Sequence, residues 1–300
     1  TAPASEVAVA GELRRVASAG HGLGVALHRL HADDPADADD AGQIVMWLTL
    51  AAAAMDHLVD DGRVEPSAMR RFVSPAAVLT ALRGGPPVEL PGHDWLGRLL
   101  ALGLDRLRAR LARRDDAFQS ELAAEVEVCL REMVTAQLYS DELTIAPWSD
   151  LAIVRTRLRA VNALTAWLAA YVGLSGRDRP PPATVAAARR AATLVGDIGW
   201  ALDALSDIHV DLDHRLWNLA WLELAEATGP DAPWLVDPDG RPDLALAALH
   251  GAGVVGRILA RIGQQILELE RDNAFGGRGA ELAQLCRYMV WAFLNAPEPP

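Results

Sequence analysis

Proline and glycine divide this chain into about ten long apolar stretches, each rich in Ala and Leu. No stretch alternates apolar and polar residues for long enough to predict a β-strand. The pattern therefore predicts an all-α protein. The expected helices span residues 6–30, 42–62, 67–83, 94–113, 117–140, 149–174, 182–212, 214–227, 243–270 and 279–294.

Composition supports helix and one large core. Apolar residues make up 51% of the 300 residues, and Ala and Leu lose little side-chain entropy in a helix. No linker is long enough to separate two cores. We predict a single helical domain over residues 1–300, in which residues 1–41 form a peripheral helix and an acidic loop.

Two of the expected helices are apolar on almost every side and yet carry acids near their ends. They are the helix that runs through Trp47 and the helix that runs through Trp200. A helix that is apolar all round is normally buried. A buried carboxylate is costly unless it is paired or binds a metal ion. The acids of these two helices are therefore candidate functional residues.

The later of the two helices carries Asp203, Asp207 and Asp211, each four residues from the next. Steps of four residues drift by only about 40° around a helix, so the three carboxylates form one stripe. Like charges at this spacing repel each other. Mg²⁺ removes the repulsion, because it prefers carboxylate oxygens and keeps positions open for phosphate. The stripe predicts a magnesium site.

The earlier helix ends in Asp56, Asp60 and Asp61. Asp56 and Asp60 share a face, whereas Asp61 turns away by about 100°. These residues are candidate metal ligands, although a polar helix end explains Asp61 equally well. Whether Asp61 ligates metal stays open.

A third acidic segment, His31 to Asp40, is expected to be a solvated loop. Asp33, Asp34 and Asp37 match a DDxxD pattern, but Pro35 interrupts it and no apolar helix leads into it. Carboxylates in such a loop remain in water. We do not predict a metal site there.

Net charge limits the partners. The formal net charge is -12, and all 28 basic residues are Arg. Nucleic acid as the main partner is excluded, because phosphate backbones need a basic face. A small anionic substrate held through metal ions is not excluded.

Cysteine usage and hydropathy bear on the compartment. Cys129 and Cys286 lie far apart and form no disulfide or zinc pattern. The longest apolar run, Ile44 to Met55, is too short to span a bilayer, and no signal-peptide pattern is present. We expect a soluble, cytoplasmic protein without stable membrane insertion, and a homodimer is left open.

Two aspartate-bearing helices in an all-helical chain of this size resemble the class I terpenoid-synthase superfamily. The segment from Asp56 to Gly62 is similar to the DxxxD motif of phytoene synthases. Asp203, Asp207 and Asp211 occupy the three ligand positions of the second motif of terpene cyclases, with Asp at all three. The resemblance covers nearly the whole chain.

Two further matches favour the cyclase branch. Bacterial terpene cyclases carry an Arg diphosphate sensor about 46 residues before the second motif, which falls on Arg157. They also carry an Arg-Tyr pair about 80 residues after it, which falls on Arg287 and Tyr288. Arg155 and Arg159 lie beside Arg157 and are alternative sensors.

The resemblance implies a helical bundle around a central apolar cavity and a lyase that ionises farnesyl or geranylgeranyl diphosphate. Three Mg²⁺ ions would bind the aspartates, and the released cation would cyclise. Trp faces stabilise cations, so the candidate cavity residues are Trp47, Trp167, Trp200 and Trp291.

Two other function classes stay open. One is a prenyl coupling enzyme, either similar to squalene and phytoene synthases or a chain-elongating prenyltransferase. The other is a helical binder of prenyl ligands that performs no ionisation. The absence of Lys disfavours chain elongation, because those enzymes hold isopentenyl diphosphate with Lys and Arg.

Overall fold

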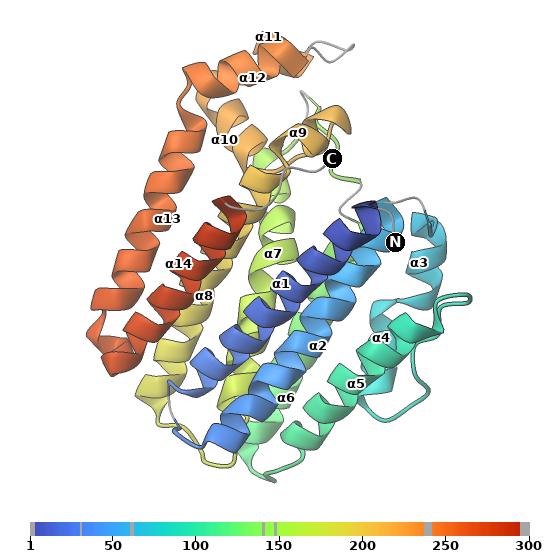
Figure 1. Cartoon of the computed structure of the whole chain (residues 1–300), viewed down its shortest axis with the longest axis vertical. Coiled ribbons are helices and arrows are strands. Elements are labelled where there is room, and N and C mark those ends of the chain that lie inside the picture. Colours follow the sequence, from blue (N-terminus) through green and yellow to red (C-terminus); the bar gives the residue numbers. More distant parts are fainter. Residues whose placement is uncertain are drawn as a thin grey trace.

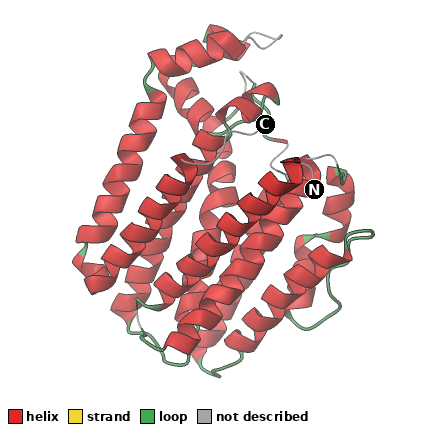
Figure 2. Ribbon diagram, in the orientation of Figure 1, coloured by secondary structure: helices red, strands yellow, loops and turns green. Residues whose placement is uncertain are grey.

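The computed structural model describes residues 4–30, 32–60, 63–139, 142–146, 149–236 and 242–294. Over these residues the chain is one all-α body with no strand (Figures 1 and 2). A short 3₁₀ segment, η2 (Asn273–Arg278), joins the last two helices. The helices are α1 Ala4–His28, α2 Pro35–Asp60, α3 Pro66–Phe72, α4 Pro75–Leu82, α5 Asp94–Leu111, α6 Ala117–Leu138, α7 Leu151–Leu174, α8 Pro182–Ser206, α9 Ile208–Asp213, α10 Leu219–Thr228, α11 Pro233–Val236, α12 Pro242–Gly251, α13 Val254–Arg271 and α14 Gly279–Leu294.

The all-α prediction is confirmed, but three of the expected helices are broken in two. The break between α3 and α4 follows from Ser74, whose side chain accepts a hydrogen bond from the Ala77 amide at 3.1 Å and starts a new helix at Pro75. The break between α12 and α13 lies at Gly253, which has a φ of 63°. The third break, at Asp207 between α8 and α9, lies within the aspartate stripe.

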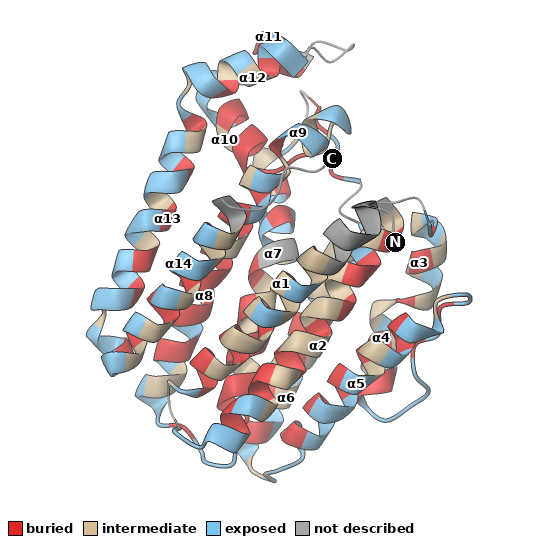
Figure 3. Cartoon of the chain, in the orientation of Figure 1, coloured by how far each residue is buried: buried red, intermediate tan, exposed pale blue. Residues whose placement is uncertain are grey.

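Helix α7 occupies the middle of the body. It packs against α1, α2, α6, α8 and α10, and buried turns concentrate where these helices meet (Figure 3). The contact with α8 is close because Gly196 lies against Ala163: a Cβ on Gly196 would meet the Ala163 carbonyl oxygen at 2.9 Å. The interior of the described body is therefore filled largely by α7.

Helix α2 is long and apolar enough, by length and composition alone, to cross a membrane. A core helix passes the same criterion. Here α2 packs along α1, α5 and α7, and Ala41, Ile44 and Val45 on it are buried. Helix α1 also contributes to the core through Leu23 and Leu27.

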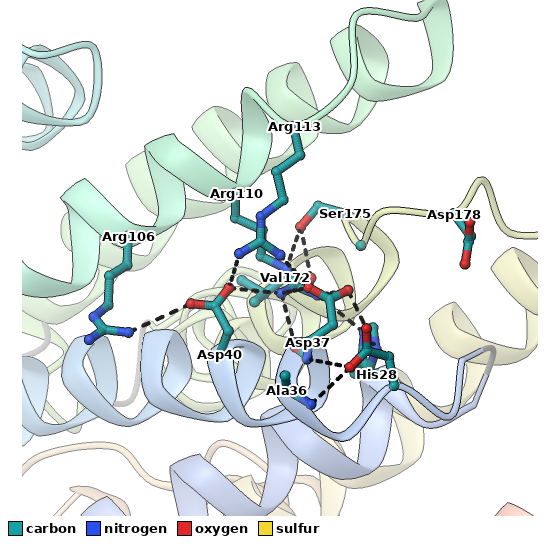
Figure 4. A network of polar contacts seen from close by, with 12 residues as sticks. His28, Ala36, Asp37, Asp40, Arg106, Arg110, Arg113, Val172, Ser175 and Asp178 are labelled. Atoms are coloured by element: carbon teal, nitrogen blue, oxygen red, sulfur yellow. Dashed lines mark hydrogen bonds and ion pairs between the residues drawn. The ribbon is translucent and has the colours of Figure 1, made fainter.

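One end of the body is held together by a buried guanidinium, that of Arg110 on α5 (Figure 4). We call this the arginine end. Nη1 donates to the Asp37 carboxylate and to the Asp40 carboxylate, each at 3.0 Å. Nε donates to the Val172 carbonyl at 2.8 Å and to Ser175 Oγ at 3.2 Å. A single side chain thus ties the start of α2 to the end of α7.

Charge balances in this network. Arg113, two residues after the end of α5, donates to Asp37 and, at 2.7 Å, to Asp40. Two guanidinium groups therefore face two carboxylates. The imidazole of His28, the last residue of α1, lies 3.1 Å from Arg110 Nη2. Such complete pairing is what makes a buried charge tolerable.

The predicted solvated loop at residues 31–40 is wrong for its second half. Helix α2 already begins at Pro35, and Asp37 in its first turn is only 6% exposed. Asp34 Oδ1 starts the helix by accepting hydrogen bonds from the amides of Ala36 and Asp37 at 2.9 and 3.2 Å. Asp33 is exposed and pairs with Arg278. The carboxylate of Asp37 leaves water because Arg110 meets it there.

Replacing Arg110 by Met should lower the free energy of unfolding by about 3–5 kcal/mol, because a buried carboxylate loses its principal partner. The matched control is Arg106→Met, which removes an exposed guanidinium 3.6 Å from Asp40 and should cost less than about 1 kcal/mol. Urea unfolding curves measure both. Equal losses in the two variants would contradict the role given to Arg110.

Stability should also fall on mild acidification, because the pKa of His28 lies below its ordinary 6.5. Burial is the largest cause and nearby Arg110 adds to it, while the Gly173 carbonyl and Asp37 oppose the shift. The unfolded chain then takes up a proton on His28 before the folded chain does. The free energy of unfolding is expected to decrease as the pH falls through 6.5 toward the lowered pKa.

The variant His28→Gln tests this pH dependence, since its side chain does not titrate. Unfolding free energies measured by urea denaturation between pH 7.5 and pH 5 should decline less in the variant than in the parent. Parallel pH profiles for the two proteins would show that His28 is not the responsible group.

Candidate metal and substrate site

The acidic motifs lie near the end of α2 and at the α8–α9 junction, toward the top of Figure 1 and away from the arginine end. We call this the aspartate end. One pocket lies at this end, and Asp56 of α2 and Leu216, in the turn after α9, both line it. The Leu216 amide in turn donates to the Asp211 carbonyl at 2.7 Å. The end of α2 and the turn after α9 thus line one pocket, whereas Asp203, Asp207 and Asp211 are not among its lining residues.

The pocket has a volume of about 100 Å³ and is almost entirely apolar. Only Asp56 and Gln137 contribute polar side chains to it. Its lining comes from the end of α2, from α3, from the last turns of α6 and from the turn after α9: Met55, Asp56, Val59, Pro66, Met69, Val73, Val134, Gln137, Leu138 and Leu216. Such a pocket suits a hydrocarbon group whose polar end lies beside a carboxylate.

On the α2 side, Asp56 is an exposed residue whose Oδ1 accepts a hydrogen bond from Gln137 Nε2 of α6. The amide therefore orients the carboxylate at the rim of the pocket. Asp60 ends α2, but its side chain, like the whole of Asp61, lies outside the described residues. The two remaining ligand candidates of this motif are thus not placed.

On the α8 side, the aspartate stripe crosses the helix break and keeps its helical path. The Asp207 amide donates to the Asp203 carbonyl at 3.1 Å, and the Asp211 amide donates to the Asp207 carbonyl at 2.8 Å. These are the hydrogen bonds of successive helical turns. Asp203 is exposed, whereas Asp207 and Asp211 are half-buried. The backbone hydrogen bonds of successive turns therefore continue across the break at Asp207, whose φ is −102°.

The turn after α9 is fixed by backbone pairing with the segment that joins α6 to α7. The Ile145 amide donates to the Arg215 carbonyl and the Trp217 amide donates to the Leu143 carbonyl, both at 2.7 Å. Arg215 has a φ of 55°, an uncommon conformation for a residue with a Cβ. The wall of the pocket that contains Leu216 is therefore firmly placed.

Three tryptophans pack together beside the same turn. Trp234 packs edge-on against Trp217, with ring centroids 6.5 Å apart, and lies 6.0 Å from Trp221. Trp221 is fully buried and donates from Nε1 to the Ile208 carbonyl at 3.2 Å. These indoles act as packing and hydrogen-bonding groups of α9 and α10.

Magnesium chemistry is compatible with the carboxylates, although the described side chains form no closed cage. Among the described residues, no three Asp, Glu, His or Cys side chains converge on a point that could hold a metal ion. Mg²⁺ in phosphate-binding sites commonly takes one or two protein carboxylates and completes its shell with waters and substrate phosphates. Asp56, Asp203 and Asp207 carry carboxylates, which are the donor type that Mg²⁺ prefers.

The candidate diphosphate sensor, Arg157, lies in the second turn of α7 and makes no ion pair with a described residue. It lines a pocket of about 330 Å³ between α6 and α7, beside Tyr139. Its neighbours face the other way: Arg155 pairs with Glu226 and Arg159 pairs with Asp197 on α8, at 2.6 and 2.9 Å. In this conformation Arg157 faces α6 and not the aspartate stripe.

Arg287 and Tyr288 lie on the outer side of α14. Arg287 is exposed and pairs with Glu270 of α13. Tyr288 is 43% exposed and stacks on Trp291, which is 60% exposed, with ring centroids 6.0 Å apart. Arg287 therefore bonds to α13, and the rings of Tyr288 and Trp291 are stacked and largely exposed.

The other candidate cavity tryptophans differ in their surroundings. Trp200, three residues before Asp203, is buried at 6% exposure. Trp47 is half-buried and lies beside Gly103 of α5, and Trp167 packs against Tyr171 at 5.8 Å. None of the three lines the pocket that contains Asp56.

No known protein family, curated protein or solved structure matches this chain.

Sequence reasoning missed two residues that hydrogen-bond to the candidate aspartates, Gln137 and Asn218. Asn218 donates to the Asp211 carboxylate at 2.8 Å and begins α10. An Asn directly before an apolar helix is a recognisable N-cap signal, so its capping role was available from the sequence. Gln137 lies on an ordinary polar helix position, and no local pattern marks its contact with Asp56.

Proposed function

We propose that this protein is a Mg²⁺-dependent enzyme that ionises a linear prenyl diphosphate and cyclises the resulting allylic cation. The observation that carries the proposal is the apolar pocket at the aspartate end, which has Asp56 at its rim and the turn that follows Asp211 as one wall. A prenyl diphosphate has the matching chemistry, since it joins a hydrocarbon chain to a charged group that divalent ions bind.

The fold agrees with the proposal at the level of class. The chain is a single all-helical body, and both acidic motifs are carried near the ends of long helices, α2 and α8. That this body is a class I terpenoid-synthase bundle is part of the proposal. Its support is the order of the motifs along the chain: Asp56, Arg157, the Asp203 stripe and then Arg287 with Tyr288.

The proposed roles follow from the chemistry of each group. Asp203, Asp207 and Asp56 would hold the cations, and Gln137 would orient Asp56. Bound Mg²⁺ would supply electrostatic stabilisation to the charge that develops on the leaving diphosphate. The apolar side chains of the pocket would keep water away from the hydrocarbon chain.

The volume of the pocket constrains how substrate enters. A cavity of 150 Å³ holds benzene, so about 100 Å³ corresponds to roughly four carbon atoms. A farnesyl chain is much longer, and ligand pockets commonly measure 300–1,000 Å³. Binding of the proposed substrate therefore requires the pocket to widen beyond its volume here.

The arginines also require rearrangement. Arg287 is held by one exposed ion pair to Glu270, and such pairs contribute only about 0–1 kcal/mol. Arg157 lies near the start of α7, next to the aspartate end. Both guanidinium groups suit diphosphate oxygens. In the proposal they turn toward the substrate when it binds, together with Tyr288.

Neutralising single aspartates tests the metal site. Asp203→Asn and Asp56→Asn keep the side-chain shape and should each reduce Mg²⁺-dependent diphosphate release by roughly 100-fold or more, because each removes an anionic donor. Asp213→Asn is the matched control: Asp213 is exposed on α9 and lies about 200° around the helix from Asp211. Unchanged release by Asp203→Asn would rule out the proposed site.

Product analysis separates cyclisation from the other function classes. Incubation with farnesyl or geranylgeranyl diphosphate alone and Mg²⁺ should give a cyclic product of unchanged carbon number and free diphosphate. A product of doubled carbon number would identify head-to-head coupling, and a requirement for isopentenyl diphosphate would identify chain elongation. Binding of these compounds without any diphosphate release would identify a binder.

A further inference from the structure

Asn218 is a buried polar residue at the junction of α8, α9 and α10. It is 5% exposed. Its Nδ2 donates to the Asp211 carboxylate at 2.8 Å and to the Ala204 carbonyl at 3.2 Å. Its Oδ1 accepts from the Trp221 amide at 3.1 Å. One side chain thus contacts the end of α8, the middle of α9 and the first turn of α10.

These hydrogen bonds use both N–H groups of the amide. The bond to Ala204 satisfies a carbonyl in the last turn of α8, where carbonyls lack a helical partner. The bond from Trp221 caps the first turn of α10. The third bond, to Asp211, is required by neither helix end. It fixes the orientation of one carboxylate in the aspartate stripe.

We propose that Asn218 is a positioning residue for the metal site: by holding the Asp211 carboxylate, it sets the geometry in which the aspartate stripe binds Mg²⁺. This inference rests on the proposed function. Carboxylates that bind metal ions are themselves held by hydrogen bonds from outer groups, and loss of such a group weakens metal binding by about 10- to 100-fold. Asn218 has the burial and the fixed geometry that such a partner needs.

The position of the stripe relative to the helix break supports this assignment. The break at Asp207 separates Asp203 on α8 from Asp211 on α9. Asn218 bonds to Ala204 on one side of the break and to Asp211 on the other. This amide therefore bridges the break between the two halves of the stripe.

The variant Asn218→Ser separates positioning from capping. Serine is a good N-cap and retains an acceptor for the Trp221 amide, but its single short hydroxyl cannot replace both N–H donors. The Mg²⁺ concentration that gives half-maximal diphosphate release should rise by about 10- to 100-fold. Release at saturating Mg²⁺ should stay close to that of the parent.

A second readout does not depend on activity. Mg²⁺ with inorganic diphosphate should raise the melting temperature of the parent, because a ligand that binds only the folded state stabilises it. In Asn218→Ser the same rise should need about 10- to 100-fold more Mg²⁺. Ser74→Ala is the control, since it removes the cap of α4 and should lower the melting temperature without changing the Mg²⁺ dependence.

If Asn218→Ser fails to fold, a second variant of nearly the same side-chain shape still tests the inference. Asn218→Asp keeps the cap but places a second carboxylate against Asp211, and the two repel each other unless a cation lies between them. Its melting temperature should lie below that of the parent without Mg²⁺ and recover when Mg²⁺ is added. A deficit that does not depend on Mg²⁺ would overturn the positioning role.

The outcomes distinguish this inference from the proposed function. If the parent releases diphosphate with Mg²⁺ and Asn218→Ser has the same Mg²⁺ dependence, the role of Asn218 is wrong and the proposed function stands. If the parent shows neither release nor a melting-temperature rise, both fail. A shifted Mg²⁺ dependence in Asn218→Ser and an unshifted one in Ser74→Ala support the inference.

Discussion

The buried guanidinium of Arg110 is the interaction on which the arrangement of the helices depends. A charge inside a protein is tolerated only if its partners are complete, and here Asp37, Asp40 and the Val172 carbonyl supply them. These partners come from α2 and α7, so the guanidinium fixes these two helices against α5. Helix α2 begins and α7 ends at Arg110, so the guanidinium anchors these helices at the ends opposite Asp56 and Arg157.

The helices could be predicted because their signals are local. Prolines and N-cap residues mark where α4 and α8 begin, and the apolar composition determines helix over strand. The burial of Asp37 could not be predicted, because Arg110 lies 73 residues away in the sequence. Asp34 followed by Pro35 is a local start signal for α2, and the resemblance of the segment to a loop concealed it.

In the candidate site, too, local spacing could be read from the sequence, whereas contacts between helices could not. Spacing predicted that the Asp203 stripe shares one side of a helix, and the structure shows the backbone hydrogen bonds of successive turns continuing across the break at Asp207. Spacing from the stripe also selected Arg157 and Arg287, which lie on α7 and α14. It did not say which neighbouring helix each side chain meets, because that depends on packing between helices: Arg157 faces α6, and Arg287 pairs with Glu270.

Helix dipoles act differently on the carboxylates at the two ends of the body. The N-terminus of a helix attracts negative charge and the C-terminus attracts positive charge, by about 0.3–1 kcal/mol per group. Asp37 lies in the first turn of α2, where its charge is favoured. Asp203 lies in the last turn of α8 and Asp56 just before the last turn of α2, where carboxylates are disfavoured and a basic residue would stabilise the helix. In the proposed function, a cation bound near either helix end would interact favourably with the helix C-terminus and with the carboxylate there, and this interaction would offset the cost of the carboxylate in the bare protein.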